Sequence, residues 1–288
     1  MRLFQAVSNQ KDFNVVRKAP EVLALVKQMC SARFYQRFKQ ESCENILVSY
    51  FYMGFKGSFK HTEILKEKFF FLDSGAYSAM STGVPVDVYQ YIDWIKENRA
   101  MIDLYCGLDD IGDYKKTLEN QRIMEAAGLH PLITFHYGEP FELLRDFCQE
   151  YEFICLGGIA GKRKQQRVPW LDNCFGVIKN YWPKRLHVFG VHDKDILLRY
   201  PFYSADASTD SFASSVGDHN VNGKRVTYTS INEVTNRDEM NILKIEASKS
   251  ITASQKSQLR LASHLLNKIQ LEKQITEVWQ KRGITWMN

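Results

Sequence analysis

The sequence lacks any run of the roughly 18 apolar residues that a membrane-spanning helix needs. Its first residues turn polar at positions 8–11, before the apolar segment of a secretory signal can form. We therefore expect a soluble cytoplasmic protein without a membrane partner.

Paired or clustered cysteines are also missing. The six cysteines are Cys30, Cys43, Cys106, Cys148, Cys155 and Cys174. The sequence has no C-x-x-C pair, and no cysteines and histidines stand at the spacing of zinc ligands. We interpret the six residues as reduced cytosolic thiols, and we predict no metal site.

The composition shows no extreme bias. The 288 residues are 44% hydrophobic and 25% charged, which is average for a globular protein. This length suits one large α/β domain that covers residues 1–288. The net charge of +5 permits a polyanionic partner without demonstrating one.

The sequence does contain a repeated unit: a short apolar run, a polar loop with Gly or Asp, and an amphipathic helix. The runs are residues 46–51, 69–72, 102–107, 132–136, 153–156, 186–190 and 202–205, with a weaker eighth at 225–229. This alternation predicts parallel strands in a (β/α)8 TIM-type barrel whose core covers about residues 46–230. An open doubly wound sheet is the alternative.

Helical patterns flank these runs. Residues 20–39 predict one amphipathic helix, and residues 252–282 predict a long C-terminal helix. The second helix has an apolar stripe formed by Leu259, Ala262, Leu266 and Ile269. We interpret this stripe as packing on the barrel, and a dimer seam is the alternative. Residues 208–223, rich in Ser, Asp, Asn and Gly, predict a long loop.

Carboxylates follow three of the predicted strands. Asp73 and Asp206 each come directly after an apolar run. The pair Asp109 and Asp110 stands just after a third run. Because the active sites of barrels lie at the carboxyl ends of the strands, we expect these acids to converge on one pocket.

Other polar residues near strand ends have two explanations each. Asp113 and Asp193 suit either the site or the N-cap of a helix. His136 either lines the site or is a hydrogen-bonded core residue. For His187, which lies inside a run, we favour the core.

Two other activities common in barrels are disfavoured. A metal-dependent hydrolase needs several N or O ligands, yet residues 46–50 offer no His-x-His pair and no histidine ends the fifth or seventh run. A phosphate site is disfavoured because Gly157 and Gly158 are followed by acids after the seventh run, instead of a Gly-rich anion nest. The two glycines would let backbone groups approach a flat ligand, or they form an ordinary turn.

Six motifs occur in one order along the chain. They are residues 71–78 (FLDSGAYS), 107–110 (GLDD), 136–138 (HYG), 156–161 (LGGIAG), 188–191 (VFGV) and 203–208 (YSADAS). This ordered set resembles the tRNA-guanine transglycosylase superfamily. Within it, the set is most similar to the deazapurine DNA-modification protein A family of phages and bacteria, which inserts 7-deazaguanines into DNA.

The resemblance implies a glycosyltransferase that exchanges guanine for a 7-deazaguanine and needs no cofactor. Asp206 would attack C1′ and form a covalent glycosyl-enzyme, and Asp73 would donate the proton to the base. Asp109 would recognise the guanine edge, although the adjacent Asp110 leaves open which acid does so. The remaining base-binding candidates are Ser74, Gly75, Tyr77, His136, Tyr137, Gly157 and Gly158.

The implied partners are DNA with a flipped or single-stranded guanosine, a free 7-deazaguanine base, and accessory DNA-modification proteins. If the gene is carried by a phage, the expected compartment is the host cytoplasm. Candidate phosphate contacts are Lys162, Arg163, Lys164, Arg167, Lys224 and Arg225. A solvated helix face is the alternative explanation of these charges.

One departure separates this chain from the tRNA enzymes. The bacterial and eukaryotic tRNA enzymes carry a Cys-rich zinc site after the nucleophile strand, whereas no cysteine follows Cys174 here. This absence favours DNA over tRNA as the substrate. The alternatives are a zinc-free tRNA-guanine transglycosylase, a non-catalytic nucleic-acid-binding barrel and a metal-dependent hydrolase.

Overall fold

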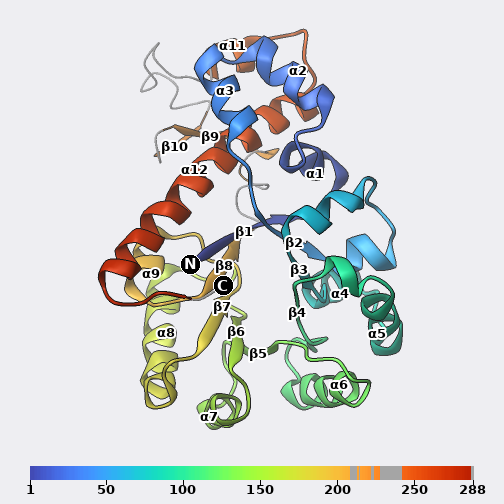
Figure 1. Cartoon of the computed structure of the whole chain (residues 1–288), viewed down its shortest axis with the longest axis vertical. Coiled ribbons are helices and arrows are strands. Elements are labelled where there is room, and N and C mark those ends of the chain that lie inside the picture. The colour runs from blue at the N-terminus through green and yellow to red at the C-terminus, as the bar shows by residue number, and fades with distance from the viewer. Residues whose placement is uncertain (208–212, 214, 222–223, 228–241, 287–288) are drawn as a thin grey trace.

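The structure is a computed structural model that describes residues 1–207, 213, 215–221, 224–227 and 242–286. Its centre is a curled sheet of eight parallel strands in the order β4-β3-β2-β1-β8-β7-β6-β5 (Figure 1). The strands are β1 (Arg2–Val7), β2 (Asn45–Ser49), β3 (Phe69–Asp73), β4 (Leu104–Tyr105), β5 (Ile133–His136), β6 (Phe153–Gly157), β7 (Arg185–Val188) and β8 (Ser204–Ala207). The predicted α/β class with a parallel, TIM-like sheet is confirmed at this level.

The two edge strands of the sheet, β4 and β5, are linked just beyond their ends. An isolated parallel bridge pairs Cys106 with Leu132. The Leu132 amide donates to the Tyr105 carbonyl at 2.9 Å, and the Gly107 amide donates to the Leu132 carbonyl at 2.9 Å. The sheet therefore curls far enough for its two edges to meet at this bridge.

The prediction of the eighth strand at residues 225–229 is wrong. Instead, β10 (Lys224–Thr227) pairs antiparallel with β9 (Asp218–Val221) in a separate two-stranded ribbon, and residues 228–229 lie outside the described part of the chain. The strand β9 also falls within the predicted loop at 208–223. The eighth strand of the sheet is β1, so the sheet begins well before the expected residue 46.

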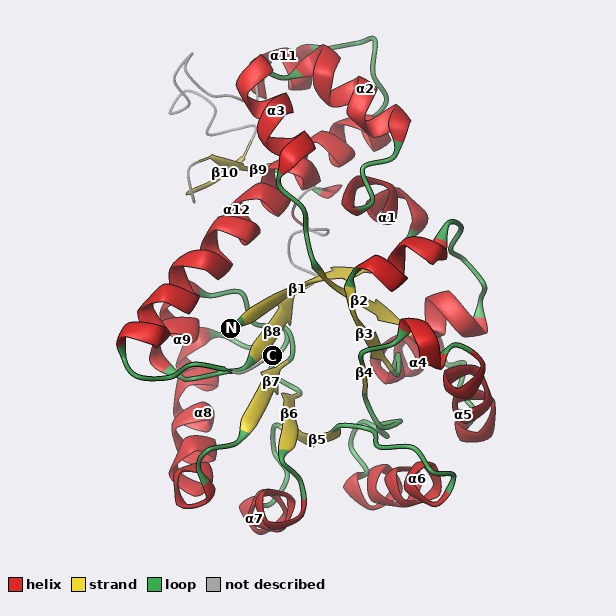
Figure 2. Cartoon of the chain, in the orientation of Figure 1, coloured by secondary structure: helices red, strands yellow, loops and turns green. Residues whose placement is uncertain are grey.

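Most of the helices lie around the outer side of the sheet, and the others lie beyond one end of it (Figure 2). The helices are α1 (Gln10–Val16), α2 (Pro20–Met29), α3 (Ala32–Gln40), α4 (Ala76–Thr82), α5 (Val88–Glu97), α6 (Tyr114–Ala126), α7 (Phe141–Glu150), α8 (Lys164–Ile178), α9 (Lys194–Arg199), α11 (Ile242–Ala247) and α12 (Ala253–Lys281). Short helical turns occupy Phe51–Phe55, Thr62–Glu67, Arg99–Met101 and Lys179–Tyr181. In the described ranges, no helix combines the length and the apolar character needed to cross a membrane.

The single helix predicted at residues 20–39 is in fact two helices, α2 and α3. The break comes at Ser31, whose backbone is extended and whose Oγ accepts a hydrogen bond from the Phe34 amide at 3.2 Å. A serine in this position caps a new helix by satisfying an amide that lacks an intrahelical partner. The two helices pack together with α11 at one end of the molecule, beyond the sheet (Figure 1).

The predicted C-terminal helix is confirmed as α12. It begins with a capping box in which the Thr252 side chain accepts from the Gln255 amide and the Gln255 side chain accepts from the Thr252 amide. Its predicted apolar stripe packs within the chain, because Leu259, Ala262 and Leu266 are buried and Ile269 packs against the same core.

Polar side chains of α12 hold β1 in place. The Glu272 carboxylate accepts from the Leu3 amide at 2.6 Å and from the Asn45 amide side chain at 2.8 Å. Nearer the middle of the helix, the buried Lys268 ammonium donates to Gln5 Oε1 at 2.9 Å and to the Phe4 carbonyl at 3.3 Å. The helix therefore forms part of the wall that surrounds the sheet.

The inside of the curled sheet is filled by side chains. This interior cluster consists of Phe4, Ala6, Leu47, Phe71, Cys106 and Cys155. The rings of Phe4 and Phe71 meet edge to face, with their centroids 5.4 Å apart. All six cysteines are buried and unpaired, as expected for reduced thiols. Because the interior is packed, a ligand has to bind at a rim of the sheet.

We expect the substitution Lys268→Met to destabilise the fold. It removes a buried charged donor and leaves Gln5 Oε1 and the Phe4 carbonyl without that partner. The expected loss is about 1–3 kcal/mol in the free energy of unfolding, measured by urea denaturation. The control is Lys273→Met on the same helix, where the side chain is 65% exposed and the loss should stay below about 0.5 kcal/mol. Equal losses in both variants would contradict this role of Lys268.

Candidate active site

Three of the predicted acids gather at the carboxyl edge of the sheet. Asp73 ends β3, Asp109 follows β4, and Asp206 lies within β8. Burial, followed by the negative charges of Asp109 and Asp206, raises the pKa of Asp73 to about 7. Asp109 and Asp206 are therefore close enough to affect the ionisation of Asp73, and the three acids share one rim of the sheet.

The position of Asp73 depends on the turn that follows β3. The Gly75 amide donates to Asp73 Oδ2 at 3.0 Å, and Ser74 beside it is fully buried. Gly75 has a φ of +82°, and a Cβ added to it would lie 2.5 Å from the Cβ of Phe51. Only glycine fits this turn without a shift of the backbone, so the turn fixes the carboxyl group of Asp73 at the rim.

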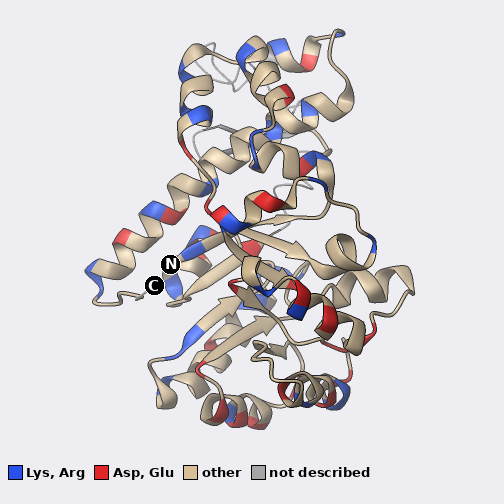
Figure 3. Ribbon diagram, turned by 45° about the vertical axis from the view of Figure 1, so that its right-hand side comes forward, with Lys and Arg blue, Asp and Glu red and all other residues tan. Residues whose placement is uncertain are grey.

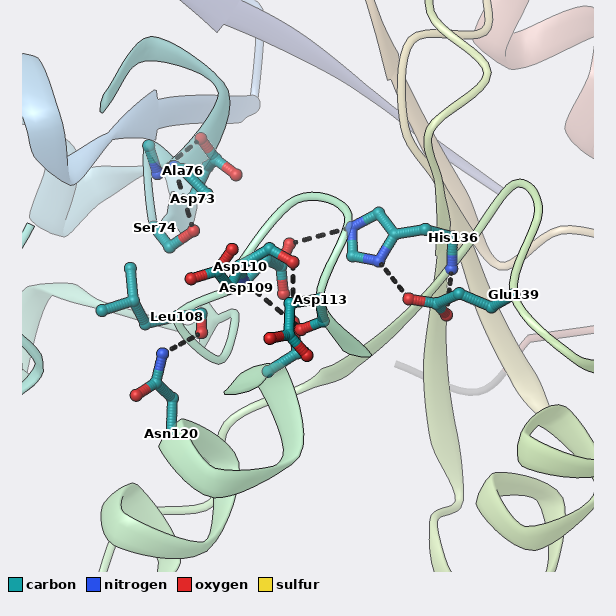
Figure 4. Close-up of polar contacts among 12 residues, drawn as sticks. Asp73, Ser74, Ala76, Leu108, Asp109, Asp110, Asp113, Asn120, His136 and Glu139 are labelled. Carbon is teal, nitrogen blue, oxygen red and sulfur yellow. Dashed lines mark hydrogen bonds and ion pairs between the residues drawn. The ribbon is translucent and has the colours of Figure 1, made fainter. Parts of the chain in front are cut away.

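The carboxylate of Asp109 contacts an imidazole that lies between two acids. His136 Nε2 is 3.3 Å from Asp109 Oδ2, and His136 Nδ1 is 3.3 Å from Glu139 Oε1 (Figure 4). Burial by itself lowers the pKa of His136, but hydrogen bonds and charge attraction from the two carboxylates outweigh it and raise the pKa to about 10. His136 is therefore a cation at neutral pH.

The structure separates the roles of the two adjacent acids. Asp110 is exposed, and its backbone amide donates to Thr117 Oγ1 at 2.8 Å. Asp109 is largely buried and points toward His136 (Figure 4). Its Oδ1 is buried and has no hydrogen-bond partner among the described residues. An unpartnered buried oxygen is an acceptor that a ligand donor can satisfy, so Asp109 is the better candidate for base recognition.

Asp206 is only 8% exposed. Its Oδ1 accepts from the Gly190 amide at 3.1 Å, and its backbone carbonyl accepts from the Val191 amide at 2.8 Å. His187 Nε2 lies 3.4 Å from the same Oδ1. The loop after β7 therefore holds the carboxylate from one side.

His187 is buried in the core, as we favoured, but its contact with Asp206 was missed by the sequence reasoning. The alternation of side chains along a strand could have revealed this contact, because residues two positions apart on a strand point to the same face. Ser204 and Asp206 point to the same face of β8, and Ser204 is the register partner of His187 on β7. Alternation thus places all three side chains inside the curl.

The glycine pair after β6 lies beside the Asp109 and His136 contact. Gly158 has a φ of +75°, and an added Cβ would come within 2.9 Å of the Tyr137 backbone nitrogen. The Tyr137 amide in turn donates to the Gly157 carbonyl at 3.0 Å. The two glycines keep the ends of β5 and β6 close together. Small residues at this rim are also what the predicted approach of backbone groups to a ligand requires.

The two tyrosines among the base-binding candidates differ in their surroundings. The ring of Tyr137 packs against Trp170, with centroids 5.7 Å apart, and Lys162 Nζ lies 4.2 Å from its centre. The side chain of Tyr77, at the start of α4, is 69% exposed. Of the two rings, that of Tyr77 is therefore the one open to solvent.

A pocket of about 630 Å³ opens between α4, α5 and α6. Asp109 and Asp110 line it together with apolar side chains such as Met80 and Tyr89. The pocket therefore adjoins the acidic rim on the side of α4.

The basic residues before and within α8 make different contacts. Besides its contact with Tyr137, Lys162 accepts through its carbonyl a hydrogen bond from Arg167 Nε at 2.6 Å. Arg163 is exposed at the start of the helix. Lys164 instead pairs with Asp195 at 2.6 Å and with Asp193 at 3.4 Å, which weakens its case as a phosphate contact.

The other two phosphate candidates, Lys224 and Arg225, lie on β10, and their side chains fall outside the described residues. In the view of Figure 3, Lys and Arg are interspersed with Asp and Glu on the helices around the sheet.

Asp113 and Asp193 are helix N-caps, each accepting two amide hydrogen bonds at the start of α6 and α9.

No known family model matches the chain, and no curated protein is similar to it in sequence. In the part of the chain that the structure describes, no three His, Cys, Asp or Glu side chains are grouped as a metal site would require.

We expect His136 to titrate far above an ordinary histidine. Its pKa is raised, so the stability that it contributes is fully present below about pH 6.5 and is lost as the pH rises through about 10. Imidazole NMR signals should show a protonated ring at pH 7.5 and a midpoint near pH 10. Glu139→Gln should lower that midpoint because one of the two carboxylates is removed. A midpoint near 6.5 in the unmodified protein would disprove the two-carboxylate arrangement.

Proposed function

We propose that this protein is a DNA-guanine transglycosylase that replaces guanine with a 7-deazaguanine base, built on a closed (β/α)8 barrel. The observation that carries the proposal is the grouping of Asp73, Asp109 and Asp206 at one rim of the sheet, where burial and the two neighbouring carboxylates raise the pKa of Asp73 to about 7. A group with this pKa can give a proton and take it back at neutral pH, which base exchange requires. The ordered motifs from residue 71 to 208 support the same reaction.

In the first half of the reaction, Asp206 attacks C1′ of the guanosine. The new bond joins a carboxylate oxygen to C1′, while the bond between C1′ and guanine N9 breaks and its electron pair stays on the base. Asp73 in its acid form supplies the proton that neutralises the departing guanine. The developing positive charge at C1′ is stabilised by the carboxylate beneath it.

In the second half, the 7-deazaguanine occupies the place that guanine left. Its N9 attacks C1′, the bond to Asp206 breaks, and the N9 proton passes to the Asp73 carboxylate. Two displacements at the same carbon restore the original configuration. The cycle leaves both aspartates as they began and uses no cofactor.

Asp109 supports selection of guanine over the other bases. Guanine carries N–H donors on its Watson–Crick edge, and a carboxylate accepts hydrogen bonds only. Asp109 Oδ1 is buried with its accepting capacity unused among the described residues, while Oδ2 faces His136. An oxygen placed to accept from the guanine N1–H would stay unsatisfied with adenine, whose N1 is an acceptor.

DNA has to present the guanosine flipped out or single-stranded, because C1′ is not accessible to Asp206 inside a duplex. Lys162, Arg163 and Arg167 lie next to the site and are the candidates for phosphate contact. We place the reaction in the cytoplasm, with accessory DNA-modification proteins as further partners.

The covalent intermediate provides the direct test. Incubation with a guanine-containing DNA oligonucleotide and no incoming base should yield a protein–DNA adduct that survives denaturation. Asp206→Asn should abolish the adduct, since an amide is not a competent nucleophile. The matched control is Asp113→Asn, which alters a helix cap and should leave adduct formation largely intact.

Parallel incubations separate the alternatives. Exchange of labelled guanine into tRNA but not DNA would favour a zinc-free tRNA enzyme. Binding of DNA without adduct or exchange would favour a non-catalytic binding barrel. Turnover that depends on stoichiometric zinc or manganese would favour a hydrolase. Each of these results would overturn the proposal.

The raised pKa of Asp73 predicts opposite pH dependences for the two half-reactions. Guanine release needs the acid form, so its single-turnover rate should fall as the pH rises above about 7. Uptake of the 7-deazaguanine by the glycosyl-enzyme needs the carboxylate, so its rate should rise through the same range. Asp73→Asn should slow both steps by about 10²- to 10⁴-fold and remove both dependences. Rates that are unchanged between pH 5.5 and 8.5 in the unmodified protein would exclude Asp73 as the proton donor.

A further inference from the structure

His187 contacts the candidate nucleophile from inside the sheet. It lies on β7 and is fully buried. The rings of Phe71 and Phe189 meet its ring edge to face, at centroid distances of 4.8 and 4.5 Å. The ring of Phe4 adds a third such contact at 5.9 Å. These aromatic walls hold the imidazole in one orientation.

Both nitrogens of this ring face polar atoms of β8. Nδ1 lies 2.9 Å from Ser204 Oγ, and Nε2 lies 3.4 Å from Asp206 Oδ1. Within the described residues, the buried Nε2 forms no hydrogen bond, and Asp206 Oδ1 at 3.4 Å is the charged atom that lies within reach of it. A buried nitrogen between aromatic rings therefore has Asp206 as its available partner.

The surroundings select one tautomer of the ring. Burial lowers the pKa of His187 despite the opposing effect of Asp206, so the ring is neutral and carries one N–H. With the proton on Nε2, the ring donates to Asp206 and the Ser204 hydroxyl donates to Nδ1, which satisfies both nitrogens. With the proton on Nδ1, the Nε2 lone pair would face a carboxylate oxygen, and two acceptors would repel each other.

We propose that His187 is a positioning residue for the nucleophile, with its Nε2–H directed at Asp206 Oδ1 and its tautomer fixed by Ser204. The Gly190 amide donates to the same oxygen at 3.1 Å. Two donors on Oδ1 orient the carboxylate and leave Oδ2 to form the bond with C1′. This inference rests on the proposed function for its role in catalysis, whereas the tautomer and the contact are properties of the protein alone.

The first part of the experiment needs no substrate. In ¹⁵N-labelled protein, the His187 signals, assigned by their loss in His187→Phe, should report a neutral ring protonated at Nε2. Asp206→Ala should shift the Nε2 signal, and Ser204→Ala should shift the Nδ1 signal. A ring protonated at Nδ1, or an Nε2 signal unchanged by Asp206→Ala, would overturn the proposal whatever the catalytic activity.

The second part compares two substitutions in single-turnover adduct formation. His187→Phe suits the aromatic surroundings but has no donor, whereas His187→Gln can place an amide N–H near the position of Nε2. We expect His187→Phe to slow the covalent step about 10- to 100-fold with little change in the half-saturating DNA concentration. His187→Gln should recover most of that rate. Ser204→Ala should cause a smaller, several-fold loss.

Urea denaturation of the same variants separates positioning from packing. If the rates of the variants follow their stabilities, with His187→Gln as slow as His187→Phe, the positioning role is wrong. It is also wrong if the loss lies in DNA binding instead of in the covalent step. If the unmodified protein forms no adduct with DNA or tRNA while the NMR result holds, the proposed function fails and the catalytic role of His187 fails with it. In that case, only the contact with Asp206 stands.

Discussion

The pairing of β1 with both β2 and β8 is the constraint on which the rest of the structure depends. This strand joins the half of the sheet that carries Asp73 and Asp109 to the half that carries Asp206. Without it, the bridge between Cys106 and Leu132 would be the remaining link between the two halves among the described residues, and the place of Asp206 relative to the other two carboxylates would not be fixed. The helix α12, more than 240 residues further along the chain, fixes β1 through the buried Lys268 and through Glu272. The end of the chain therefore stabilises the geometry of the site.

Three carboxylates at one partly buried rim repel one another, and the structure compensates for each of them differently. Asp73 accepts from the amide of Gly75 and still has a raised pKa, so it holds a proton readily. Asp109 faces the cationic ring of His136. Asp206 faces the amide of Gly190 and the ring of His187. Chemically identical side chains therefore lie in three different environments, and burial together with the other two carboxylates raises the pKa of Asp73.

The sequence correctly predicted the features that a local pattern of residues encodes. Apolar runs located seven of the strands, and the acids after them were correctly expected to share a rim. It failed where polar residues interrupt the apolar pattern of a strand. Arg2 and Gln5 break the apolar pattern of β1, yet Gln5 is buried because Lys268 hydrogen bonds to it from α12. A residue 263 positions away cannot be inferred from a local pattern. For the same reason, the antiparallel strand β10 was assigned to the wrong sheet.

The sequence by itself determined seven of the eight strands of the sheet, the long C-terminal helix, and the place of Asp73, Asp109 and Asp206 at or near strand ends. These features depend on neighbouring residues and on strand and helix periodicity. Only the tertiary structure decided which of Asp109 and Asp110 points into the site, how Asp73 comes to have a raised pKa, and that His187 faces Asp206. Each of these depends on burial and on distances between strands that are far apart in the chain, and such distances exist only once the sheet has curled.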